Sequence, residues 1–180
     1  DVGMMKIGDT ADFIVVNNLN DFKIKRTYIN GALVAENGVT NIERVSSIVV
    51  NNFLIGEKHA RDFAMKLQGT KIRVIEALDG QLITNELAYV PKTENGFVVS
   101  DTSRDILKIS VVNRYAEARP AVSFIRNFGL QRGAIASSVG HDSHNIIAVG
   151  VDDESICRVV NKIIAAKGGV AAVSGSAEMM

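Results

Sequence analysis

The chain has little cysteine, no net charge and no long apolar run, and each absence excludes a class of protein. Its one cysteine, Cys157, cannot form an internal disulfide, which excludes a secreted cystine framework. Twenty basic residues balance twenty acidic ones, so there is no electrostatic basis for binding nucleic acid or an anionic membrane. No apolar run approaches the ~18 residues of a membrane span, and the first residues lack the basic and apolar regions of a signal peptide. We therefore expect a soluble, cytoplasmic protein that binds neither nucleic acid nor membrane.

The chain is long enough to bury a sizeable core. Its 180 residues correspond to one large domain or two small ones. Apolar residues make up 47% and charged residues 22%, which is ordinary for globular proteins and excludes a disordered chain. The chain opens on Asp1 and closes soon after an apolar strand-like segment. Either a piece of a longer polypeptide or simple processing explains these ends, and the residues alone favour neither.

Residues 1–45 are predicted to form short strands. Residues 13–16 are a compact apolar run. Asn30 and Gly31 separate two further apolar runs, and Asn-Gly is the strongest short-range hairpin signal because a type I′ turn needs positive φ at both central positions. This β-hairpin or β-sandwich piece is too small to bury its own sheet, so it must pack on something. Residues 46–60 have little pattern and are interpreted as a linker.

Residues 61–180 are predicted to form a mixed α/β domain. Strands are expected at 63–68, 72–75, 97–99, 106–112, 134–139 and 145–151, while periodicity leaves 121–130 open between helix and strand. From Ile156, apolar residues recur at the spacing of one face of an amphipathic helix, and Gly168-Gly169 supplies its stop. A strand over 170–173 then completes a C-terminal strand-helix-strand unit. The whole chain is therefore expected to have an α+β fold.

One polar cluster, residues 137–145, lies between two predicted strands and is the candidate site. It holds two of the three histidines, His141 and His144, with Asp142 between them. Imidazole and carboxylate are the usual ligands of zinc, iron or manganese, but either an extended or a helical segment presents two ligands rather than the three or four of a closed site. Asp142 could instead hold a histidine in one tautomer, as in a general-base pair. Because Asp, Ser and Asn form turns, the cluster could also only cap backbone groups.

Other candidates carry less chemistry. A charged stretch, made up of Asp101, Arg104, Asp105 and Lys108, is interpreted as a helix cap or a salt-bridged turn. Cys157 lies beside the apolar stripe of the predicted helix and is interpreted as a packed thiol. His59 is interpreted as a surface residue. The glycines are not spaced as a dinucleotide or phosphate loop.

The segment 133–150, GAIASSVGHDSHNIIAVG, closely resembles the C-terminal region of the bacterial adenine deaminase family of the amidohydrolase superfamily. Asp101 with 105–108, and 111–112 with Arg114, resemble the same region. The N-terminal residues resemble the small β-domain that flanks amidohydrolase barrels, so 1–45 would be part of that domain and 61–180 the C-terminal domain. The HDSHN motif is specific, whereas the β-domain pattern is shared by many amidohydrolases.

The resemblance implies hydrolysis of adenine to hypoxanthine and ammonia in purine salvage. It implies a manganese or iron site carried mainly by a (β/α)₈ barrel whose first ligands form a His-x-His pair. This chain contains no His-x-His, and it is far shorter than the roughly 250 residues of a barrel plus these domains. The resemblance therefore implies a C-terminal fragment, truncated at its end as well, that is inactive alone. Its implied partners are adenine, the missing barrel domain and further copies of the chain in a homo-oligomer.

The polar cluster motivates roles for the candidate site in such a complete enzyme, where the loop would reach the mouth of the barrel. His141, Asp142 and His144 would have a supporting catalytic role, and His141 and His144 would be metal ligands. Substrate contacts would come from Ser137, Ser138 and Asn145. Two positions depart from the family pattern: Tyr115 stands where a histidine is usual, and Gly140 where alanine is common. Two alternatives remain: a structural and oligomerising module that covers the barrel, in which the histidines only order the loop, and an independent metal-binding domain.

Overall fold

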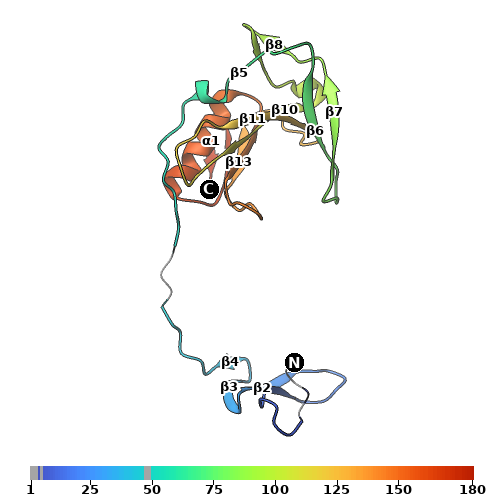
Figure 1. Ribbon diagram of the computed structural model, residues 1–180, viewed down its shortest axis with the longest axis vertical. Helices are drawn as coiled ribbons and strands as arrows, with labels where there is room; N and C mark the ends of the chain where they lie inside the picture. Colours follow the sequence, from blue (N-terminus) through green and yellow to red (C-terminus); the bar gives the residue numbers. More distant parts are fainter. Residues whose placement is uncertain (1–3, 5, 47–49) are drawn as a thin grey trace. The chain divides into compact units, whose positions relative to one another are not determined.

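The computed structural model describes residues 4, 6–46 and 50–180 (Figure 1). The chain divides into two compact units, Asp1–Val49 and Val50–Met180. Within the described ranges, no helix is long and apolar enough to cross a membrane. Each unit is described by itself below.

The first unit is a four-stranded antiparallel sheet in chain order. Its strands are β1 (Phe13–Val16), β2 (Ile24–Ile29), β3 (Ala32–Glu36) and β4 (Val39–Thr40). Asn30 and Gly31 have φ of 52° and 76°, which confirms the predicted hairpin turn between β2 and β3. The rings of Phe13 and Tyr28 stack at 4.6 Å across β1 and β2. None of the residues described in this unit is buried, so it has no closed core of its own.

The second unit is built on an eight-stranded sheet in the order β15-β14-β12-β13-β10-β11-β6-β7. The strand bounds are β6 (Ile72–Ala77), β7 (Thr84–Tyr89), β10 (Ile106–Val112), β11 (Ala121–Arg126), β12 (Ala134–Ser137), β13 (Ile146–Gly150), β14 (Val170–Ser174) and β15 (Ala177–Met179). The strands β11 and β6 pair in parallel, and the other neighbours are antiparallel. The segment 121–130, which periodicity left open, therefore begins as a strand.

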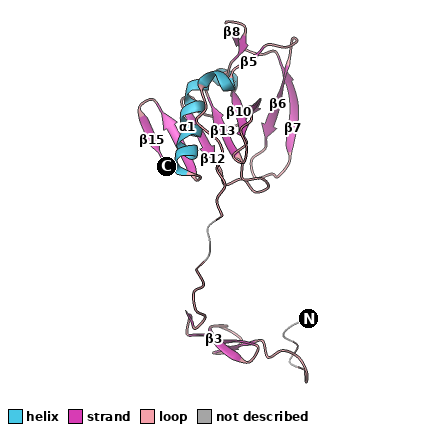
Figure 2. Ribbon diagram, turned by 60° about the vertical axis from the view of Figure 1, so that its left-hand side comes forward, coloured by secondary structure: helices cyan, strands magenta, loops and turns pink. Residues whose placement is uncertain are grey.

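The helix α1 (Asp153–Ala166) packs on one face of β12, β13 and β14 (Figure 2). Asp152 caps its first turn, since Oδ1 accepts a hydrogen bond of 2.6 Å from the Ser155 N–H. The helix ends at Lys167, in the left-handed conformation, followed by Gly168 and Gly169. Its fully buried apolar stripe is Ile156, Val159, Val160 and Ile163. Removing each of these side chains from water contributes about 2 kcal/mol to the free energy of folding. The predicted strand-helix-strand unit and the α+β fold are confirmed.

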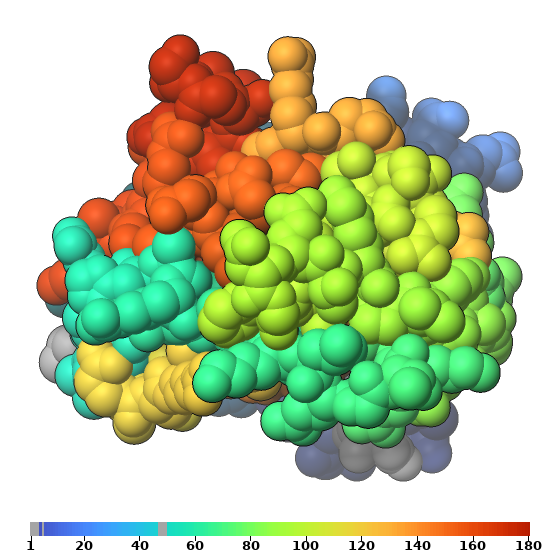
Figure 3. Space-filling view, turned by 90° about the horizontal axis from the view of Figure 1, so that it is seen from above, coloured from blue at the N-terminus to red at the C-terminus, as the bar shows by residue number. Residues whose placement is uncertain are grey.

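Residues 50–59, the second half of the expected linker, lie along the second unit rather than free of it; we call them the strap. Phe53 and Ile55 pack against the core beneath α1. Asn161 of α1 holds the strap at Lys58, where its Oδ1 accepts from the backbone N–H and its Nδ2 donates to the carbonyl, both at 2.9 Å. In Figure 3 the turquoise end of the strap lies between orange α1 and the yellow segment near 115–120. Residues 47–49 of the expected linker lie outside the described residues.

The strand expected over 63–68 is mostly wrong. Residues Ala60–Phe63 form a 3₁₀ helix, η1, and only β5 (Met65–Lys66) is a strand, in a small sheet with β9 (Phe97–Val98) and β8 (Thr93–Glu94). Phe63 is fully buried, and its carbonyl accepts a 3.2 Å hydrogen bond from the Nζ of Lys108. That ammonium, itself 1% exposed, also donates to Asp153 at 2.5 Å. Burial of Phe63 by distant elements overrides the local alternation.

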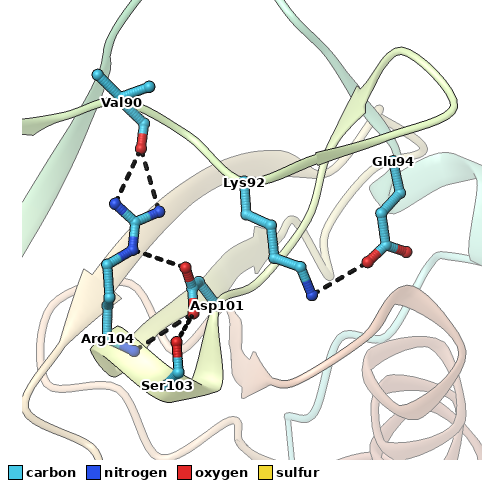
Figure 4. Close-up of polar contacts among 6 residues, drawn as sticks. All are labelled: Val90, Lys92, Glu94, Asp101, Ser103 and Arg104. Carbon is cyan, nitrogen blue, oxygen red and sulfur yellow. Dashed lines mark hydrogen bonds and ion pairs between the residues drawn. The ribbon is translucent and has the colours of Figure 1, made fainter.

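Of the charged stretch made up of Asp101, Arg104, Asp105 and Lys108, the first three form a capped turn as expected (Figure 4). The expectation is wrong for Lys108, which lies in β10 and is buried, because its ammonium bonds Phe63 and Asp153. Asp101 precedes the 3₁₀ turn η2 (Thr102–Arg104) and accepts from the Ser103 hydroxyl and the Arg104 Nε, each at 2.6 Å. Both terminal nitrogens of Arg104 donate to the Val90 carbonyl at 3.1 Å. The hydrogen bonds from Ser103 and then Arg104 lower the pKa of Asp101 from 3.8 to about 2.

This lowered pKa predicts a defined acid dependence of stability. Because folding favours the Asp101 carboxylate, its contribution is fully present above pH 3.8 and is lost as the pH falls towards about 2. We expect Asp101→Asn to lower the free energy of unfolding at neutral pH, and the curves of the two proteins to converge near pH 2. Urea unfolding across that range measures this. Curves that stay parallel down to pH 2 would contradict the assignment.

A second prediction concerns Gly133, which has φ of +74° where β12 begins beside β14. A Cβ at Gly133 would lie 1.9 Å from the Val173 carbonyl oxygen, whereas Gly129, with φ of +69°, has no atom within 4 Å of that position. We expect Gly129→Ala to cost about 1 to 2 kcal/mol of stability from backbone strain alone. Gly133→Ala should cost about 3 kcal/mol or more because β14 must shift. Denaturant unfolding of both variants checks this, and equal losses would show that the close approach is unimportant.

Candidate functional site

The residues 137–145, which we call the histidine loop, connect the end of β12 to the start of β13. These strands pair antiparallel, with Ser137 opposite Ile147, so the sheet fixes both ends of the loop. Inside it, the His144 N–H donates to the Gly140 carbonyl at 3.0 Å and closes a tight turn. His144 itself has φ of +51°, in the left-handed region that is uncommon for residues other than glycine but that histidine adopts more often than most. The expected turn at 140–143 is confirmed.

The three residues expected to carry chemistry lie on the outer side of this loop. His141 and Asp142 contact each other through Nδ1 and Oδ1 at 2.9 Å, and their side chains are 99% and 95% exposed. His144 is exposed as well. A carboxylate at Nδ1 favours the tautomer with the proton on that atom and leaves Nε2 free to accept a hydrogen bond. The structure thus brings His141 and Asp142 within hydrogen-bonding distance of each other, with both side chains facing solvent.

The loop does not fit a metal centre by itself. Within residues 4, 6–46 and 50–180, no three His, Cys, Asp or Glu side chains come together as a possible metal site. A closed site needs three or four such ligands. Metal ligation by His141 and His144 therefore needs further ligands from elsewhere.

The three residues expected to contact substrate make hydrogen bonds within the protein. Ser138, 6% exposed, exchanges two hydrogen bonds with Gly169: its N–H donates at 2.9 Å and its Oγ accepts at 3.0 Å. Ser137 Oγ accepts from the Val139 N–H at 3.0 Å. Asn145 Oδ1 accepts from the Arg114 N–H at 3.3 Å. These three side chains hold the loop, whereas His141, Asp142 and His144 are displayed by it.

Sequence reasoning missed the residues that support the loop from outside. The Arg114 guanidinium lies over the rings of Phe53 and Tyr115, at 4.8 and 4.9 Å. It donates to Asn51 Oδ1 at 3.1 Å and to the Tyr115 hydroxyl at 3.2 Å. Asn51 and Phe53 come from the strap, which carries no local signal for such a contact. The family resemblance points to the positions of Arg114 and Tyr115, but no local pattern predicts their contacts with the strap.

Comparisons with known proteins identify the family. The family described as "Adenine deaminase C-terminal domain" matches residues 81–180, which include the histidine loop, Arg114 and Tyr115. The chain is 48% identical over 181 residues to an adenine deaminase of Salinibacter ruber, covering all of this chain and 33% of that protein. The chain belongs to the adenine deaminase family. The expected resemblance is therefore confirmed.

Other relatives in this family match over the same extent. An adenine deaminase of Borreliella afzelii is 42% identical over 96% of this chain and 32% of its own length. One from Methanosarcina mazei is 46% identical over 98% of this chain and 34% of its own length. The chain thus spans about a third of the length of these curated adenine deaminases. Its similarity extends through both units, beyond the matched C-terminal domain.

Proposed function

We propose that this chain is part of an adenine deaminase that hydrolyses adenine to hypoxanthine and ammonia in purine salvage, in the cytoplasm. The observation that carries the proposal is the 48% identity to a protein named adenine deaminase over the whole chain. A match over 100% of the chain spans the positions of the histidine loop and of the residues that support it. The substrate class follows from the relatives' name.

The proposed division of labour places the metal outside this chain. The described residues contain no cluster of metal ligands, so they do not fit the manganese or iron that the family resemblance implies. That metal would be held by the (β/α)₈ barrel, a domain that the resemblance implies and that would be this chain's partner. No step of the reaction is assigned to a metal on these residues.

The proposed role of the histidine loop is to present polar groups to the substrate site of the complete enzyme. His141 and Asp142 form an exposed, oriented pair, and such a pair can accept or donate a hydrogen bond to a purine. Ser138 and Asn145 support this display through their bonds to Gly169 and Arg114, and Ser137 through its bond to Val139 within the loop. Substrate contact by these three side chains would require the loop to rearrange.

A second candidate function is a structural and oligomerising module, favoured by one surface of the sheet. Val111, Ile147 and Val170 are 38%, 39% and 60% exposed. Val111 pairs with Ile147, Ile147 pairs with Ser137, and Ser137 pairs with Val170. The three apolar residues therefore lie in one row across the sheet, at its histidine-loop end. Exposed apolar rows of this kind mark interaction sites. Here the row would contact the barrel or a second copy of the chain.

The first prediction from this proposal concerns the chain alone. We expect the isolated 180 residues to show no adenine deamination, with or without added manganese or iron, because the metal-binding part is elsewhere. Release of ammonia from adenine measures this. Metal-dependent turnover by the isolated chain would contradict the division of labour.

The second prediction separates the two candidate functions in the complete enzyme. We expect His141→Ala to lower kcat/KM about tenfold or more while leaving Tm unchanged, because its side chain is fully exposed. His144→Asn tests the second histidine, since asparagine tolerates the left-handed backbone. Ser138→Ala should lower Tm instead, because it removes a buried acceptor. If the histidine variants lower Tm and leave kcat unchanged, the structural module is the correct function.

A further inference from the structure

A continuous set of hydrogen bonds runs from the end of α1 to the histidine loop. It begins at the left-handed residue Lys167, whose carbonyl accepts from Asn51 Nδ2 at 2.7 Å. Asn51 Oδ1 in turn accepts from Arg114 Nη1 at 3.1 Å. The strap therefore ties the segment after β10 to the C-terminus of the helix.

Arg114 is immobilised at the centre of this set. Two aromatic rings, Phe53 and Tyr115, lie within 5 Å of its guanidinium carbon, and the faces of both rings attract the cation. Its Nε is buried and has no hydrogen-bond partner among the described residues. The contacts with the two rings and with Asn51 hold the guanidinium in one orientation, although its Nε donor stays without a hydrogen bond. A lysine could not reproduce these contacts, because its ammonium is not planar.

Two contacts pass from this centre to the loop on either side of His144. The Tyr115 hydroxyl donates to the Ser143 carbonyl at 2.8 Å while it accepts from Arg114 Nη2 at 3.2 Å. The backbone N–H of Arg114 donates to Asn145 Oδ1 at 3.3 Å. Residues 143 and 145 are thus fixed while His144, between them, has φ of +51°. An uncommon backbone conformation persists only where its surroundings hold it.

We propose that Arg114 and Tyr115 are positioning residues for deamination: with Asn51 they form a latch that fixes the backbone at 143–145 and so sets the direction of the displayed histidines. This rests on the proposed function of the histidine loop. Neither residue needs to touch substrate. The loop is otherwise exposed on its outer side, so a shift of its backbone would move His141, Asp142 and His144 together. Displacements of about 1 Å in a reacting group can cost on the order of 100-fold in rate.

The test is Tyr115→Phe in the complete adenine deaminase that contains this chain. The ring and its contact with Arg114 remain, but the hydroxyl and its bonds to Ser143 and Arg114 are lost. We expect backbone amides of 140–145 to exchange hydrogen about three- to tenfold faster, since one hydrogen bond contributes about 1 kcal/mol. kcat should fall by a similar factor with KM less affected. Arg114→Lys should have at least the same effects, and the double variant should fall short of their product.

Tyr89→Phe is the matched control. The Tyr89 hydroxyl accepts from Arg126 Nη1 at 2.5 Å, and the guanidinium lies 5.8 Å from its ring, so the pair resembles Arg114 and Tyr115 but sits on β7. This variant loses a similar hydrogen bond and should change neither loop exchange nor kcat. If Tyr89→Phe lowers kcat as much as Tyr115→Phe does, the loss of activity reflects lower overall stability and not the position of the loop. That result would overturn the proposal.

Exchange and kinetics together distinguish failure of the latch from failure of the proposed function. If Tyr115→Phe leaves exchange at 140–145 unchanged, the latch does not hold the loop and the proposal is overturned. If exchange rises but kcat is unaltered, the positioning role is overturned. In either case, the activity of His141→Ala tests the proposed function of the histidine loop separately. A loss of activity in that variant supports this function, whereas full activity contradicts it.

Discussion

The close packing of α1 on strands of small residues is the constraint on which the second unit depends. The buried stripe of the helix lies over Ala134, Ala136, Ala148 and Ala171. Gly150 allows the closest approach, because a Cβ there would lie 2.6 Å from the Cγ1 of Ile156. The helix therefore sits close to β12, β13 and β14 and holds those strands together. Since the histidine loop joins β12 to β13, this packing places the candidate site.

The histidine loop has one set of side chains that hold it in place and another set that is exposed. Ser138 and Asn145 bond residues outside the loop, and Ser137 bonds Val139 within it. The latch of Asn51, Arg114 and Tyr115 adds support from outside. This support leaves His141 and Asp142 exposed as an oriented pair. In the proposed function, a loop that displays polar groups in this way would suit a part of an enzyme that completes a site formed mainly by another domain. The chain belongs to the adenine deaminase family and spans about a third of the length of its relatives. Both facts are consistent with such a role.

Sequence reasoning predicted the elements whose signals are local. The 3.6-residue spacing from Ile156 predicted α1, Asn30-Gly31 predicted the hairpin, and the apolar runs predicted β10 and β13. It missed contacts made between distant segments. Residues 50–59 have no periodicity, yet Asn161 and Arg114 hold them in place across 103 and 63 positions of sequence. Phe63 likewise turned an expected strand into a 3₁₀ helix because Lys108 and the core determine its position.

A structure of the complete enzyme with adenine or a non-hydrolysable analogue bound measures the central claim most directly. The claim is that the latched histidine loop belongs to the substrate site. The account predicts the side chain of His141, Asp142 or His144 within hydrogen-bonding distance of the purine or of a group that contacts it, with Tyr115 still bonded to Ser143. A bound purine with the whole loop facing bulk solvent far from it would contradict the account.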